Sequence, residues 1–74
     1  MSDNARALHD ILAAIADRSG RAVIAIPEIV NGLGVDEVEA ARLINELIDV
    51  KAVLHDGENS DGLILRVLEL AEFP

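Results

Sequence analysis

The pattern of apolar and polar residues over residues 33–54 predicts a turn, one long amphipathic helix and the start of a strand. When residues 36–50 are placed at 100° steps, the apolar ones gather on one broad face. That face holds Ala40, Ala41, Leu43, Ile44, Leu47, Ile48 and Val50. The opposite face holds Glu39, Arg42, Asn45, Glu46 and Asp49. We therefore expect a helix that packs against the rest of the protein on one side only.

The start of this helix carries a capping signal. Asp36 stands just before the periodic run and Glu39 follows three residues later. This is the spacing of a capping box, in which each side chain accepts a hydrogen bond from a backbone N–H that the helix leaves unpaired. Gly34 suits the left-handed residue that ends a preceding short helix. Two helices are thus expected to meet at a tight turn over residues 33–35.

The N-terminal half predicts two further helices with a short extended segment between them. Residues 4–17 place Leu8, Ile11, Leu12 and Ile15 at helical spacing, and Ser2 or Asp3 can cap the start. After Ser19-Gly20, residues 21–26 are β-branched and long enough for one brief strand or an extended connection. Pro27 then stands where the first turn of a helix tolerates it, and this second helix is about two turns long.

The C-terminal part predicts a β-hairpin. Residues 53–55 favour a strand, residues 56–62 a polar loop, and residues 63–70 a returning strand. Residues 63–70 also fit a helix, because Leu63, Ile64, Val67, Leu68 and Ala71 form a helical stripe. The Asp-Gly pairs on both sides of the loop favour the hairpin.

Length and composition indicate one domain over residues 1–74 with an aliphatic core. A chain of 74 residues is near the size at which burial only just offsets chain entropy, so a homodimer or a complex with a partner is expected. Phe73 is the only aromatic residue, which leaves little means of stacking on nucleic-acid bases. The absence of cysteine excludes disulfides and thiolate chemistry and fits a cytoplasmic protein. We expect no signal peptide and no membrane span, since the longest apolar run is residues 22–26.

The charge balance points away from nucleic acid. Fourteen acidic residues against six basic ones give a formal net charge of −8. Affinity for nucleic acid comes largely from cations that displace counterions along the phosphates, so this chain starts at a disadvantage on DNA. The charge instead fits a partner protein with a basic surface.

No motif indicates catalysis or a bound cofactor or metal. Asp56, Glu58 and Ser60 alternate as in a calcium-binding loop, but the required glycine and the bidentate glutamate are missing from their places. His9 and His55 are isolated and are expected at the surface or its boundary. No serine has a histidine beside it in a recognisable motif. We therefore expect a protein that is not an enzyme, with no cofactor.

The order helix, short strand, short helix, turn, long helix and hairpin resembles that of a winged helix-turn-helix domain, and the resemblance covers nearly the whole chain. Many members carry a pattern around the turn that this chain matches with Leu33-Gly34, Asp36, Ala40, Ile44 and Leu47. Lys51 stands where a glycine often leads into the hairpin, which is called the wing. The resemblance implies a small α+β fold with three helices and a C-terminal β-hairpin wing, in the order α-β-α-α-β-β. It implies little about function, because the same scaffold serves DNA readers, RNA binders and protein-interaction modules.

This chain departs from the DNA-binding members at the positions that usually face DNA. Those members carry mostly cationic and small polar residues on the third helix and the wing. The corresponding positions here, which we predict to bind a partner, are Glu39, Arg42, Asn45, Glu46, Asp56, Glu58 and Asp61. One cation thus stands among five acids.

We therefore favour a protein-interaction module with an acidic third-helix and wing surface. One alternative is a small DNA-binding transcriptional regulator that relies on dimerisation and on a few cations, which are Arg42, Lys51 and Arg66 together with Arg18 and Arg21. Another is an acidic inhibitor that mimics nucleic acid and occupies the channel of a nucleic-acid-handling enzyme. The plainest alternative is that the acids form a solvated surface without a partner, since acids near a helix N-terminus stabilise it whatever the function.

Overall fold

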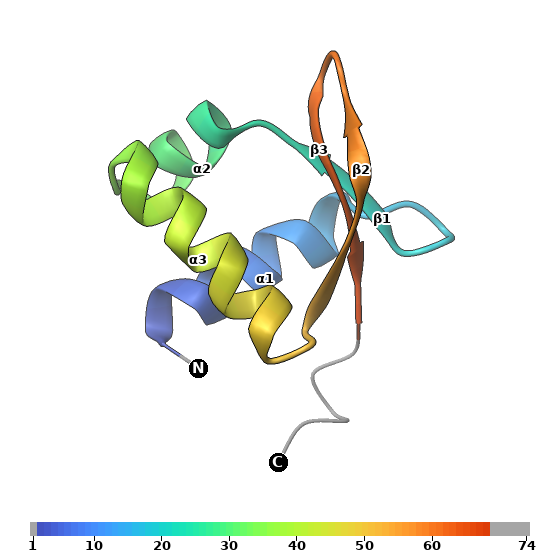
Figure 1. Cartoon of the computed structure of the whole chain (residues 1–74), viewed down its shortest axis with the longest axis horizontal. Helices are drawn as coiled ribbons and strands as arrows, with labels where there is room; N and C mark the ends of the chain where they lie inside the picture. Colours follow the sequence, from blue (N-terminus) through green and yellow to red (C-terminus); the bar gives the residue numbers. More distant parts are fainter. Residues whose placement is uncertain (1, 69–74) are drawn as a thin grey trace.

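A computed structural model of the protein describes residues 2–68. This part of the chain holds three α-helices and a three-stranded antiparallel sheet (Figure 1). The elements are α1 (Asp3–Ile15), β1 (Arg21–Ile24), α2 (Ile26–Leu33), α3 (Glu37–Asp49), β2 (Val53–Asn59) and β3 (Gly62–Val67). The small α+β class and the order α-β-α-α-β-β are therefore confirmed. No helix within residues 2–68 has the length and apolar character needed to cross a membrane.

The helices begin and end largely where the capping residues predicted. The Ser2 hydroxyl accepts a hydrogen bond from the Ala5 N–H at 3.1 Å, and the Asp36 carboxylate accepts one from the Glu39 N–H at 2.7 Å. Gly34 ends α2 with a left-handed φ of +68°. Only half of the predicted capping box forms, because the Glu39 carboxylate pairs with Arg42 instead. An ionised guanidinium gives that carboxylate a stronger hydrogen bond than a neutral backbone N–H does.

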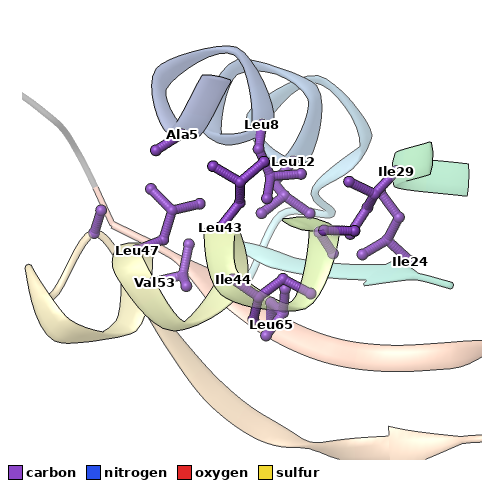
Figure 2. Close-up of a cluster of buried hydrophobic side chains, with 13 residues drawn as sticks. Ala5, Leu8, Leu12, Ile24, Ile29, Leu43, Ile44, Leu47, Val53 and Leu65 are labelled. Atoms are coloured by element: carbon purple, nitrogen blue, oxygen red, sulfur yellow. The ribbon is translucent and has the colours of Figure 1, made fainter. Parts of the chain in front are cut away.

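The core lies between α1, α3 and the sheet (Figure 2). Leu8 and Leu12 of α1 pack with Leu43 of α3, and all three side chains are fully buried. Full burial of a leucine contributes about 1.5–3 kcal/mol, so this aliphatic contact is a major source of stability in a chain almost without aromatic residues. The sheet closes the core from below with buried side chains that include Val53 and Leu65.

The sheet has the strand order β1-β3-β2, so the last strand lies in the middle. Leu65 of β3 is paired with Ala22 on one side and with His55 on the other. Side chains of directly paired residues lie on the same face of a sheet, and Leu65 and Ala22 are buried. This face therefore turns toward the helices, and Arg21 and Val23, which alternate with the buried residues, lie on the outer face.

The hairpin is longer and its loop shorter than predicted. The predicted polar loop over residues 56–62 is wrong, because β2 continues to Asn59 and only Ser60 and Asp61 form the turn. Gly57, Glu58 and Asn59 pair with β3, and the register shifts between His55 and Gly57, as at a β-bulge. The returning strand is confirmed as β3, against the helical alternative. The last residues of the predicted strand, 69 and 70, lie outside the described part.

Two expectations about burial are wrong. Of the apolar face predicted over residues 36–50, Ala41 and Val50 are exposed, and Ile48 is only partly buried against the core. His9, expected near the surface, is only 4% exposed, and its Nε2 atom lies 2.8 Å from the carbonyl oxygen of Leu68. A histidine can be buried here because this hydrogen bond satisfies one of its ring nitrogens.

Candidate functional site

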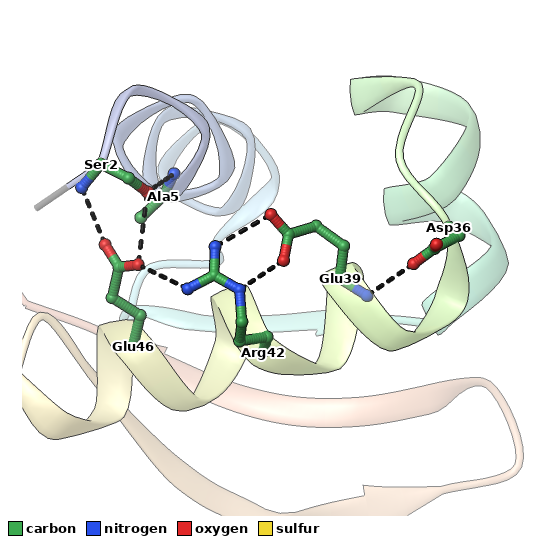
Figure 3. A network of polar contacts seen from close by, with 6 residues as sticks. All are labelled: Ser2, Ala5, Asp36, Glu39, Arg42 and Glu46. Carbon is green, nitrogen blue, oxygen red and sulfur yellow. Dashed lines mark hydrogen bonds and ion pairs between the residues drawn. The ribbon is translucent and has the colours of Figure 1, made fainter.

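The seven predicted site residues do not form one surface. Glu39, Arg42 and Glu46 lie together along the side of α3 next to the start of α1 (Figure 3). Asn45 lies on another side of α3 and faces the hairpin. The remaining three residues belong to the hairpin, where Asp56 and Glu58 are in β2 and Asp61 is in the turn.

The residues on the α1 side of α3 form a connected network. The Arg42 guanidinium donates from Nη2 to Glu39 Oε2 at 2.9 Å, and its Nη1 lies 3.5 Å from Glu46 Oε1. The other oxygen of Glu46 accepts a hydrogen bond from the Ser2 backbone N–H at 2.8 Å. Figure 3 shows that this network joins the first residue of the described chain to the middle of α3.

This network holds its groups in their charged forms. The hydrogen bond with Arg42 lowers the pKa of Glu39 below its usual value, and the Ser2 backbone N–H lowers the pKa of Glu46. The hydrogen bond and charge of Glu39 raise the pKa of Arg42. Because one cation is shared by two carboxylates, this side of α3 carries a net charge of about one acid. Its side chains are already engaged within the protein, which reduces what they can offer to a partner.

Asp56 is also engaged within the protein. Its Oδ2 atom lies 3.2 Å from Arg21 Nε and 3.4 Å from Arg66 Nη2, so one carboxylate bridges two arginines from β1 and β3. The cluster lies on the outer face of the sheet, to which Arg21 belongs. Asp56 is therefore separated from the α3 surface with which the sequence grouped it.

An apolar groove opens between α3 and the hairpin. It encloses about 230 Å³ and is lined from α3, from the start of α2 and from both hairpin strands. The lining residues are Ile26, Ala41, Ile44, Asn45, Ile48, His55 and Leu63. Asn45 and His55 are the polar members and come from opposite walls, one from α3 and the other from β2.

Acidic residues flank this groove. Glu58 is paired with Leu63, so its side chain lies on the sheet face that lines the groove. Glu37 lies one helical turn before Ala41, and Asp49 one turn after Asn45. All three are exposed, and within residues 2–68 none of them takes part in an ion pair. We call Glu37, Asp49 and Glu58 the acidic rim. Asp61, in the turn beyond Glu58, is exposed as well.

The sequence prediction treated the apolar face of α3 as one packed face and did not separate a groove wall from it. One signal could have corrected it: the apolar face of α3 spans about half of the helix circumference, whereas a helix packed on one side needs a stripe of only about 100°. The centre of this face, Ala40, Leu43, Ile44 and Leu47, is buried. Its hairpin edge, Ala41 and Ile48, lines the groove. The part of the apolar face that is wider than one packed stripe therefore indicated a second apolar surface on α3.

The described part of the chain holds no group of three histidine, aspartate or glutamate residues arranged to bind a metal ion. The groove is a concave surface with a distinct chemistry, which is apolar with acids around it. Comparison with protein-family models, with curated proteins and with solved structures finds no significant match to this chain.

Proposed function

We propose that the protein is a non-enzymatic protein-interaction module with a winged-helix-like fold, and that it binds its partner through the surface between α3 and the hairpin. The observation that carries this proposal is the chemistry of that surface. An apolar groove is flanked by unpaired acids, where a DNA-binding module of this shape would need cations. Apolar surface that stays exposed on a small domain favours contact with another polypeptide.

The positions of the cations support the same proposal. Arg42 is held by two carboxylates, and Arg21 and Arg66 share Asp56 on the outer face of the sheet. Each carboxylate brought within about 4 Å of a phosphate costs about 1 kcal/mol even in water. The net charge of −8 adds repulsion over the whole molecule. Duplex DNA is therefore an unfavourable ligand for the α3 surface.

The proposal is tested by recovering the protein from native lysate with its bound material, in parallel with and without nuclease treatment. We expect a polypeptide that stays bound after the nucleic acid is digested. Loss of all bound material on digestion would argue for a nucleic-acid ligand and against the proposal.

A titration of the purified protein against labelled duplex DNA at about 50 mM salt provides the complementary measurement. Electrostatic binding is strong at this ionic strength, so a DNA-binding protein would give a saturable signal. We expect none. Sequence-selective binding that persists as the salt is raised would replace the proposed function by DNA recognition.

A further inference from the structure

We propose that the groove between α3 and the hairpin is the anchor site for a basic amphipathic helix of a partner protein. This inference rests on the proposed function and specifies the site and the chemistry of the partner. Apolar side chains of the partner would enter the groove, and lysine or arginine residues beside them would face the acidic rim. This is the helix-in-groove mode of peptide recognition.

The size of the groove favours side-chain anchors over a small-molecule ligand. Its volume of about 230 Å³ is below the range of about 300–1,000 Å³ that is usual for cofactor and drug-sized ligand sites. Five of the seven lining residues are aliphatic or alanine. A site of this kind suits one or two apolar side chains that are desolvated on binding, as at the centre of a protein interface.

The two polar lining residues can orient the bound helix. Asn45 offers an amide with donors and an acceptor, and His55 offers a ring nitrogen on the opposite wall. Within residues 2–68 neither side chain makes a hydrogen bond to the protein. Both are exposed, so polar groups on the rim of a partner helix can reach them. Contacts with these two side chains would fix the orientation of the bound helix and add little to its affinity.

Charge complementarity selects the partner. The acidic rim places Glu37 beside the start of α3 and Glu58 on the hairpin wall, and the nearby cation Arg42 is held by Glu39 and Glu46 on another side of α3. Lys51 follows the end of α3, whereas Glu37 is the first residue of that helix and, like Glu58, has no ion-pair partner within residues 2–68. A second copy of this chain would bring a net charge of −8 to the same place and be repelled. A basic helix would be attracted.

The test uses the full chain and a labelled model peptide of about five helical turns, made of leucine at helical spacing on one face and lysine on the other. Two control peptides are a scrambled sequence of the same composition and a version with glutamate in place of lysine. Binding is measured by fluorescence polarisation, and the binding site is mapped from NMR chemical shifts. We expect saturable binding of the basic amphipathic peptide only, with the largest shifts at Ala41, Asn45, Ile48, His55 and Leu63.

Matched variants separate the groove from general charge attraction. Ala41→Phe fills the groove from an exposed helix position and should weaken binding at least about tenfold. Glu37→Gln with Glu58→Gln should weaken it about three- to tenfold and reduce its salt dependence. Asp3→Asn with Asp10→Asn removes the same charge from exposed positions of α1 and should change affinity less than about twofold. Asn45→Trp is a second blocking variant if A41F does not fold.

Three results would overturn the proposal: shifts confined to α1 or to the outer face of the sheet, equal binding of the scrambled peptide, or unchanged affinity of both blocking variants. Concentration-dependent dimerisation with the same groove shifts would assign the groove to a second copy instead. Failure of the proposed function gives a different result, because no polypeptide would then be recovered with the protein from lysate. A native polypeptide partner that A41F still retains would keep the proposed function and reject the groove.

Discussion

Lys51 adopts a backbone conformation that glycine would adopt at lower cost. Its φ is +60°, and it is the non-glycine residue of the described chain with a positive φ. The Lys51 N–H bonds to the Ile48 carbonyl at 3.0 Å, and the Ala52 N–H bonds to the Leu47 carbonyl at 2.8 Å. These two bonds are those of a Schellman motif, which ends a helix with a left-handed residue. The motif turns the chain from α3 into β2 and so fixes where the hairpin starts.

Lys51→Gly should stabilise the protein by about 0.5–1 kcal/mol. The left-handed conformation costs a residue with a Cβ atom about 1–2 kcal/mol, and glycine would remove this cost. The greater freedom of glycine in the unfolded chain offsets part of that stabilisation. Urea unfolding of both proteins measures the difference. Lys51→Ala is the control, because alanine keeps the Cβ atom and should give no comparable gain. Equal stabilisation by both variants would show that the lysine charge, and not the backbone, is unfavourable.

Gly62 is required by space as well as by backbone conformation. Its φ is +144°, and a Cβ atom built there would lie 2.4 Å from the Ile24 carbonyl oxygen. That oxygen belongs to the backbone of the neighbouring strand β1, which is paired with β3 through Ile24 and Leu63. Glycine at this position therefore allows the start of β3 to lie close to β1.

Gly62→Ala should destabilise the protein by more than about 2 kcal/mol, because a backbone clash adds to the strained conformation. Gly34→Ala is the matched control: its φ is +68°, but nothing lies within 4 Å of the added Cβ atom. It should cost only about 1 kcal/mol, the conformational part alone. Chemical denaturation of both variants tests this order, and equal losses would mean that the β1 backbone moves away without cost.

At the level of elements, the sequence predicts the helices better than the sheet. The signals for α3 are local, since Asp36, Gly34 and the helical period all lie within a few residues of each other. The length of β2 is not determined by local signals. Its polar residues Asp56 to Asn59 have loop-like composition, and they are extended because β3 supplies the hydrogen bonds. The burial of His9 could not be predicted for the same reason, since its partner Leu68 is 59 residues away.

The end of β3 is tied to α1 by His9, which gives a third prediction. The Leu68 carbonyl accepts the hydrogen bond, so Nε2 of His9 carries the proton. His9→Leu replaces the imidazole with an apolar side chain of similar size and removes the hydrogen-bond donor. The free energy of unfolding should fall by about 1 kcal/mol or more. We also expect faster amide hydrogen exchange at Val67 and Leu68, whose N–H groups bond to Gly20 and Ala52. Unchanged exchange at these two amides would show that β3 holds its end without α1.

At the level of the whole molecule, the sequence identified the acidic character of the site but not its arrangement. Composition alone gives the net charge, and the order of helices and strands along the chain gives the elements that carry the acidic residues, which are α3 and the hairpin. Which acids stay free depends on contacts across the fold, such as Ser2 with Glu46 and Asp56 with two arginines. These contacts join residues that no local pattern relates. The groove was missed because its wall is built mainly of aliphatic residues, the same residue type that builds the core.

Hydrogen bonds to three carboxyl groups make the stability of the molecule depend on pH. Hydrogen bonds lower the pKa of Asp17, Glu39 and Glu46: Asp17 bonds chiefly to the Ser19 side chain, Glu39 to Arg42, and Glu46 to the Ser2 backbone. A carboxyl group with a lower pKa in the folded state stabilises that state when it is ionised. Its contribution is complete above the unfolded pKa, which is 3.8 for aspartate and 4.5 for glutamate, and is lost as the pH falls through the folded value.

We therefore expect the melting temperature to fall as the pH is lowered below about 4.5, and Glu46→Gln to isolate one part of this fall. Near pH 7 the variant should be less stable than the unmodified protein, because glutamine replaces the ionised acceptor of the Ser2 N–H. The difference should shrink as the pH falls through the lowered pKa of Glu46, where this carboxyl group becomes neutral. Since the Glu46 side chain is partly exposed, added salt should also reduce this difference in stability. Glu58→Gln removes an equal charge from an exposed hairpin position that makes no ion pair within residues 2–68, so at pH 7 it should lower the melting temperature less than E46Q does. Parallel melting curves for E46Q and the unmodified protein across this range would mean that Glu46 does not join α1 to α3 in solution.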